Sequence, residues 1–283
     1  MSTLALLGGP QLRVLAKGIG SAHVPRGAGG GRDATVLDLC DRSFADAADA
    51  HERLDALADH FRSTGDRRTV FLSMYVQVTD GVRESVDAGE FADPAWTLDY
   101  LTAFADLYRR ALFDYERGDL ERVPDAWALA FAHAETDDRL VTQHALLGVN
   151  AHIVHDLALA LDAVGIGEGT TRARRYGDHV AVNRVLERLV EDLQTTLAAD
   201  APGLADADVT LGRVDELLAA FSVAEAREHA WRVAVALADT LAPVRPVVRW
   251  YLNAVAGGAA QVVLSPPPDV VATLRTAETE RRG

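Results

Sequence analysis

The chain has 283 residues, of which 49% are hydrophobic, and it carries a formal net charge of −14. This apolar share is enough for a sizeable core, so the composition indicates a folded protein rather than a disordered one. The sequence offers no stripe of basic residues that would neutralise phosphates, which argues against nucleic acid and anionic lipid as partners.

A lone cysteine, Cys40, rules out an internal disulfide and suits a reducing compartment, so we expect a cytoplasmic protein. The first 20 residues lack the basic start, long apolar centre and cleavage site of a signal peptide. The apolar run from Trp250 to Ser265 is short for a membrane span and is interrupted by Gly257 and Gly258. We therefore expect no membrane span.

The order of segments predicts one helical domain with polar ends. Residues 1–33 read as a flexible lead-in that ends in the glycine-rich stretch PRGAGGGRD. Residues 34–265 read as the helical domain, and residues 266–283, after SPPPD, read as a polar tail.

The first predicted helices have recognisable ends. One covers Phe44 to Arg62 and stops at Thr64-Gly65, because glycine commonly ends a helix. The next lies within residues 66–89, whose β-branched centre nevertheless repeats its apolar residues at helical spacing. Asp93 as N-cap and Pro94 in the first turn predict a third helix that ends near Gly118.

Further helices are predicted for the rest of the domain. A short one opens in residues 123–135, and a central helix covers residues 137–164 up to the break GIGEG. The later helices are expected at residues 171–199, 211–220, 222–241 and 246–257. Because strand-type alternation is scarce, the predicted fold is all-α, a single-domain helical bundle around the buried central helix.

The central helix contains polar residues on an otherwise apolar surface. Its apolar side chains point in nearly every direction of a helical wheel, which is typical of a helix in the middle of a bundle. His144, Gly148, His152 and Asp156 recur every four residues and so share one ridge. Gly148 predicts a notch beside the two histidines, which would suit either a small ligand or a close helix crossing.

Three roles fit the spacing of His152 and Asp156. The pair can bind a divalent metal from one helix face, or the carboxylate can orient the imidazole as a general base. It can also be a buried hydrogen-bonded unit that only fixes helix packing.

The segment NAHIVHDLALAL resembles the signature N-A-H-I-x-x-D-L of an uncharacterised family of helical proteins, a domain of unknown function. The resemblance extends over about residues 34–265. It includes Tyr75 with Thr79, the FADP turn, Trp127, and the segments DHVAVN and REHAWRVA. It singles out Asn150, His152 and Asp156, and it implies no particular reaction.

Other polar residues are candidates for the same site. Tyr75 and Thr79 share a helix face, where a phenol could donate a proton. Asp178 or His179 could complete a metal site with the central pair. Further candidate ligand-binding residues are Asn150, which we expect to cap or pair with another helix, and Asn183, Arg227 and Trp231. Arg227 and Trp231 lie four residues apart, so a stacked pair could clamp an anion.

Two functions remain open at this point. One is an enzyme that acts on a small, largely apolar molecule by hydrolysis or proton transfer, with His152, Asp156 and Tyr75 as catalytic residues. The other is a non-catalytic helical module that binds a small ligand or a partner, with the same polar residues serving structure. The sequence does not indicate the oligomeric state.

Overall fold

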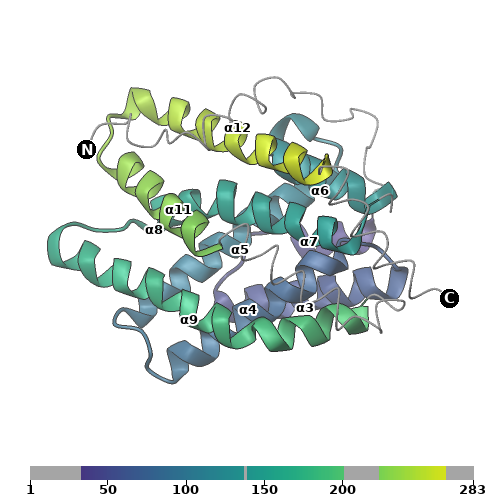
Figure 1. Ribbon diagram of the computed structural model, residues 1–283, viewed down its shortest axis with the longest axis horizontal. Coiled ribbons are helices and arrows are strands. Elements are labelled where there is room, and N and C mark those ends of the chain that lie inside the picture. The colour runs from purple at the N-terminus through teal and green to yellow at the C-terminus, as the bar shows by residue number, and fades with distance from the viewer. Residues whose placement is uncertain (1–32, 137–138, 201–222, 266–283) are drawn as a thin grey trace.

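The computed structural model describes residues 33–136, 139–200 and 223–265, and all the secondary structure in these residues is helical (Figure 1). The fold class is therefore all-α, as predicted. The predicted lead-in (up to residue 32), the predicted helix at 211–220 and the polar tail lie outside the described residues. The α-helices are α2 (Ala34–Cys40), α3 (Ala47–Thr64), α4 (Thr69–Asp87), α5 (Pro94–Glu116), α6 (Asp125–Thr136), α7 (Val141–Asn150), α8 (Leu157–Val164), α9 (Gly169–Asp200), α11 (Val223–Ala238) and α12 (Arg245–Leu264).

The middle of the fold is one continuous rod made of α7, a π-helical segment called η3 (Ala151–Asp156), and α8. In Figure 1 the rod lies between α11 and α12 on one side and α3, α4 and α9 on the other. It contacts α4, α5, α6, α11 and α12, so its neighbours surround it. The described part of the predicted central helix begins at Val141 rather than near residue 137.

Aspartate caps set the starts of several helices. Asp46 accepts hydrogen bonds from the amides of Ala48 and Asp49 at 2.8 and 2.9 Å, which satisfies donors that the first turn leaves without partners. Asp93 caps α5 ahead of Pro94, as the sequence predicts. At the other end of α3, Gly65 adopts φ +72°, the left-handed conformation that glycine tolerates best.

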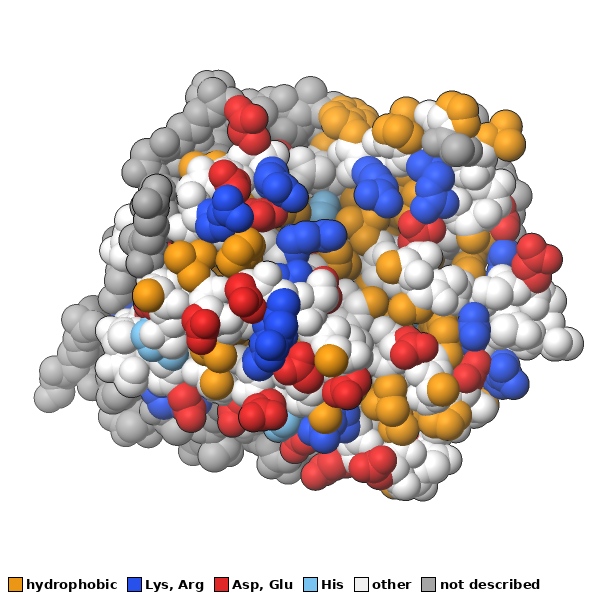
Figure 2. All heavy atoms as spheres, turned by 180° about the vertical axis from the view of Figure 1, so that it is seen from behind, with side chains coloured by type: hydrophobic (Ala, Val, Ile, Leu, Met, Phe, Trp, Pro, Cys, Tyr) orange, Lys and Arg blue, Asp and Glu red, His pale blue; other side chains and the backbone are white. Residues whose placement is uncertain are grey.

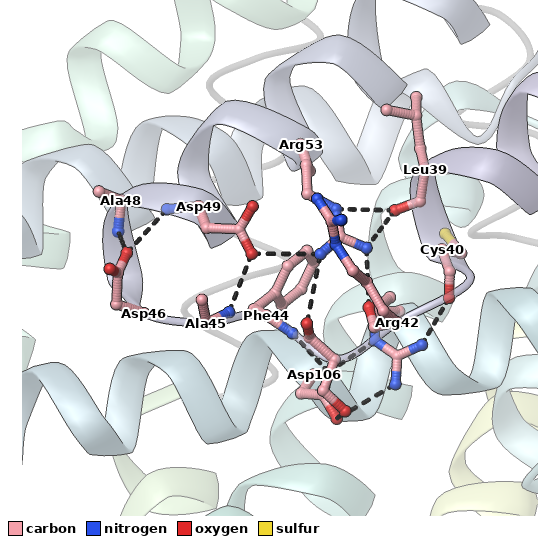
Figure 3. Close-up of polar contacts among 12 residues, drawn as sticks. Leu39, Cys40, Arg42, Phe44, Ala45, Asp46, Ala48, Asp49, Arg53 and Asp106 are labelled. Atoms are coloured by element: carbon pink, nitrogen blue, oxygen red, sulfur yellow. Dashed lines mark hydrogen bonds and ion pairs between the residues drawn. The ribbon is translucent and has the colours of Figure 1, made fainter.

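Two buried arginines, Arg53 and Arg109, fix the corner between α2 and α3, and Figure 3 shows the contacts of Arg53. The Arg53 guanidinium donates to the carbonyl of Leu39, in the last turn of α2, and to that of Arg42, just beyond the end of the helix. Arg109 on α5 donates to the carbonyl of Cys40 and to Asp106. Carbonyls at a helix C-terminus have no partner within the helix, so these guanidinium groups stabilise the turn that follows.

The predicted helices differ from the observed ones at their ends. The sequence predicts a first helix from Phe44, but α3 begins at Ala47, where the Asp46 cap determines its start. It predicts that the last helix ends at Gly257, yet α12 continues to Leu264. Its glycines cost helix propensity, but the turns beyond them bury Ala260 and Leu264. Seven-residue α2 was not predicted, because it is too short to show a helical period.

The buried side chains form a large cluster around the rod and a smaller one between α4, α5 and α9. Acidic and basic side chains are interspersed over the face seen in Figure 2, with hydrophobic side chains gathered at its upper right. One helix of the described chain, Val141–Val164, is long and apolar enough to cross a membrane. Since 61% of its most apolar window is buried inside this protein, burial in the core accounts for its composition.

Candidate functional site

The π-helical segment η3 positions the candidate polar residues. The amide of Leu157 donates to the carbonyl of His152, five residues earlier, so the rod is locally wider than an α-helix. A wheel at 100° per residue therefore fails across this segment. His155, the residue before Asp156, is hydrogen-bonded directly to its carboxylate.

Asp156 is a buried carboxylate with three donors around it. Its Oδ2 accepts from the indole Nε1 of Trp127 at 2.7 Å and lies 3.4 Å from Nδ1 of His152. Its Oδ1 lies 2.7 Å from Nδ1 of His155. Burial acts to raise the pKa of Asp156, but hydrogen bonds from the two histidines outweigh it, and the pKa is lowered. The carboxylate is therefore ionised at neutral pH.

His152 lies among aromatic rings and is 1% exposed. The Phe104 ring stacks on the imidazole with centroids 3.5 Å apart, and the Tyr75 ring meets it edge-on at 4.3 Å. Burial lowers the pKa of His152, against the opposing effect of Asp156, so the ring is neutral at pH 7. With Nδ1 directed at Asp156, its Nε2 is left without a hydrogen-bond partner in the described chain.

Tyr75 contributes a second polar atom without a partner. Its hydroxyl is buried and bonds to no group in the described part of the protein. Thr79, its neighbour one turn on, donates to the backbone carbonyl of Tyr75 at 2.8 Å. Burial raises the pKa of Tyr75 well above its usual value, so the phenol keeps its proton and can act as a donor.

A cavity of about 630 Å³ lies between α4, α5, the rod, α9 and the start of α11. Its wall is mostly aliphatic and aromatic, including Phe71, Tyr100 and Phe104. Both His152 and Tyr75 line it. Its size falls within the range of about 300–1,000 Å³ typical of small-molecule sites.

The opposite wall of the cavity, from α9 and α11, contains Asn183 and Arg227. The Arg227 guanidinium donates to Oδ1 of Asn183 and to the backbone carbonyl of His179, each at 2.7 Å. The imidazole of His179 lies 3.1 Å from both the Tyr100 hydroxyl and the carbonyl of Arg227. Burial lowers the pKa of His179 well below its usual value, and the Arg227 charge acts in the same direction.

The structure does not bring Asp178 and His179 to the central pair. The Asp178 carboxylate accepts from the amides of Ala92 and Asp93 at 2.8 and 2.7 Å, which fixes the turn before α5. Both ring nitrogens of His179 are engaged within the protein. Among the described residues, no three His, Cys, Asp or Glu side chains cluster in a way that could hold a metal ion.

The notch predicted at Gly148 is occupied by Phe71. A Cβ added at Gly148 would lie 2.6 Å from the Cβ of Phe71 and closer still to its Cγ. Gly148 therefore serves close packing of α4 on α7, and the space for a ligand lies on the far side of Phe71. Asn150 points to another helix, as expected, and donates to the carbonyl of Ala256 at 2.8 Å.

The stacked pair of Arg227 and Trp231 does not form. Trp231 packs instead against the rings of Tyr176 and His179, with centroids 5.2 and 5.3 Å away. Arg227 is turned toward the cavity wall and Asn183. Of the two residues in the predicted anion clamp, Arg227 therefore lines the cavity and Trp231 does not stack on it.

Comparison with known proteins places the chain in a family. The model of a family of unknown function, DUF5995, matches residues 47–266. The chain belongs to this family. No curated protein and no solved structure matches the sequence. The predicted membership of an uncharacterised helical family is thus confirmed, while the DUF5995 assignment indicates no reaction or ligand.

The sequence does not identify several residues of this candidate site. Phe71, Tyr100 and Phe104 form much of the cavity wall, and the Trp127 indole anchors Asp156. One signal was available in the sequence: Tyr100, Phe104 and Tyr108 recur every four residues and so share a helix face. Such a ridge is ordinary in a core, so only the tertiary structure distinguishes a cavity wall from packing.

Proposed function

We propose that the cavity binds a small, largely apolar molecule and that His152 acts on it as a general base. The observation that carries this proposal is a pair of buried polar atoms, Nε2 of His152 and the Tyr75 hydroxyl, that have no hydrogen-bond partner among the residues that the structure describes. Both belong to residues that line one apolar cavity. A buried polar group without a hydrogen bond costs roughly 1–3 kcal/mol, so a ligand that supplies both bonds gains that energy.

The arrangement around His152 suits proton abstraction. Nδ1 is directed at the ionised Asp156, so Nε2 has the free lone pair and can accept a proton from the bound molecule or from a water beside it. The proton then resides on the imidazole, whose positive charge Asp156 stabilises. The electron pair stays on the substrate, and an oxygen that gains charge accepts a hydrogen bond from Tyr75.

Asp156 is a positioning residue in this scheme. Hydrogen bonds to Trp127 and His155 hold its carboxylate in place. It does not line the cavity, so it acts on the substrate through His152.

Two measurements on the full chain test the proposal. Calorimetric titration with 1-octanol and 2-nonanone measures binding, and Val182→Trp, which adds bulk to the cavity wall, is expected to abolish it. Incubation with 2-nonanone in D₂O, followed by mass spectrometry, measures deuterium gained beside the carbonyl. His152→Gln is expected to remove the protein-dependent exchange, whereas His51→Gln, outside the cavity, keeps it.

Absence of binding by both probes would remove the proposal altogether. Binding without exchange in the wild-type protein would leave the second candidate, a non-catalytic binding module. The close stacking of Phe104 on a histidine that is 1% exposed favours that candidate. It predicts that His152→Ala and Asp156→Ala lower the free energy of unfolding by about 1–3 kcal/mol and have no effect on a reaction.

A further inference from the structure

Four arginines of the described chain have buried side chains, and three of them have acidic partners. Arg53 pairs with Asp49, Arg68 with Asp66 and Glu116, and Arg109 with Asp106. Arg227 is the most buried of the four, at 3% exposure. No described carboxylate lies within the 4.0 Å of an ion pair with it.

Within the described residues, no negative charge compensates that of Arg227. Its two hydrogen bonds, to Asn183 and to the carbonyl of His179, are to neutral oxygen atoms and use two of five N–H donors. The Tyr100 hydroxyl, which also interacts with the guanidinium, is a neutral group as well. Glu187 is the acidic residue on the described cavity wall, but it is exposed to solvent and forms no ion pair with Arg227. A buried guanidinium without a counter-charge is costly, which is why such groups are normally paired.

We infer that the molecule bound in this cavity is an amphipathic monocarboxylate, whose carboxylate Arg227 receives while its apolar body fills the remaining space. This inference rests on the proposed function and adds the chemical class of the ligand. Arg227 lines the cavity from α11, across from the wall that contains His152 and Tyr75. A carboxylate would supply the missing negative charge and can accept two parallel hydrogen bonds from a guanidinium.

The rest of the wall favours a single negative charge over a phosphate dianion. Arg227 is the one cationic side chain on the described cavity wall, and its neighbour Asn183 is neutral. Asn183 accepts from Nε, which holds the plane of the guanidinium against α9. The remaining lining is overwhelmingly apolar, so a ligand with a second charge would bury that charge without a partner.

A set of three probes with the same eight-carbon chain tests this inference by calorimetry. Octanoate is anionic, 1-octanol is neutral and n-octylamine is cationic at pH 7. In the wild-type protein, octanoate is expected to bind roughly 10-fold or more tightly than 1-octanol, since hydrogen bonds to charged groups are the stronger ones. Octylamine is expected to bind most weakly, because it brings a second positive charge to Arg227.

Three variants test whether Arg227 causes the preference for octanoate over 1-octanol. Arg227→Gln is expected to remove the advantage of octanoate over 1-octanol, measured as the ratio of the two affinities in the same variant. Arg227→Lys should retain part of the preference, because it keeps the charge but loses the fork geometry. Arg232→Gln, on the exposed face of the same helix, is the matched control and should leave all affinities unchanged.

The outcomes separate the inference from the proposed function. Equal binding of octanoate and 1-octanol by the wild-type protein would overturn the anionic ligand and leave the apolar cavity intact. Binding of none of the three would overturn both. Should Arg227→Gln fail to fold, as melting followed by circular dichroism would show, the probe series on the wild-type protein and the lysine variant still decide the matter.

Discussion

Replacement of Gly148 by alanine tests whether Phe71 packs so tightly against Gly148 that no space is left for a ligand there. The new Cβ would overlap the Cβ and Cγ of Phe71, atoms near the backbone that cannot swing away as the end of a flexible side chain can. Overpacking of this kind costs about 1–3 kcal/mol. Alanine also favours the helix by about 1 kcal/mol relative to glycine, so the clash must be measured against a control.

Gly177→Ala supplies that control. Gly177 lies inside α9, is exposed, and has no atom within 4 Å of an added Cβ. It therefore gains the helix propensity without the clash. Urea denaturation should show Gly177→Ala more stable than wild type by about 0.5–1 kcal/mol, and Gly148→Ala less stable than Gly177→Ala by about 1–3 kcal/mol.

Phe71 determines how far the disturbance spreads. Its ring centroid lies 5.5 Å from that of Trp127 and 5.6 Å from that of His152, so a displaced ring would move the cavity wall. Adding Phe71→Leu to Gly148→Ala should cost less than the sum of the single changes, because the smaller side chain leaves room for the new methyl group. Equal stability of Gly148→Ala and Gly177→Ala would refute this account of the packing.

Three further predictions follow from the buried polar groups. Because the pKa of His179 is well below its usual value, only the unfolded chain gains this proton as pH falls below about 6.5, and stability should decrease there by up to about 1.4 kcal/mol per pH unit for this group. Urea denaturation between pH 7.5 and 5 measures how the free energy of unfolding changes with pH. In His179→Gln this dependence should be weaker than in the wild-type protein by the contribution of one proton, and an unchanged dependence would contradict the prediction. Trp127→Phe removes the indole donor to Asp156 and should lower stability by at least about 2 kcal/mol, with Asp156 titrating at higher pH by carbon-13 NMR. Asn150→Ala removes the hydrogen bond to the carbonyl of Ala256 and should lower the free energy of unfolding by about 1–3 kcal/mol in thermal melts. A loss below about 0.5 kcal/mol, the size of an ordinary surface change, would contradict that role.

Much of the architecture was predictable from local signals. The helical period of α4 outweighed its β-branched composition, and the aspartate caps and glycine ends set the bounds of α3 and α5. Burial of the central segment followed from its apolar residues in all directions, and the pair His152 and Asp156 followed from their spacing. These signals act within one or two helical turns, so a sequence contains them directly.

The sequence by itself determined the fold class, the central helical segment, and the pairing of His152 with Asp156 on it. It could do so because helical period, capping and hydrophobicity are properties of neighbouring residues. Only the tertiary structure decided that the rod widens into a π-helix, that Phe71 closes the notch at Gly148, and that Arg227 faces the cavity without a carboxylate partner from the described residues. Each of these depends on residues more than 40 positions apart or on a shift of helical register. Distances across such separations are set by how whole helices pack, and no local pattern specifies them.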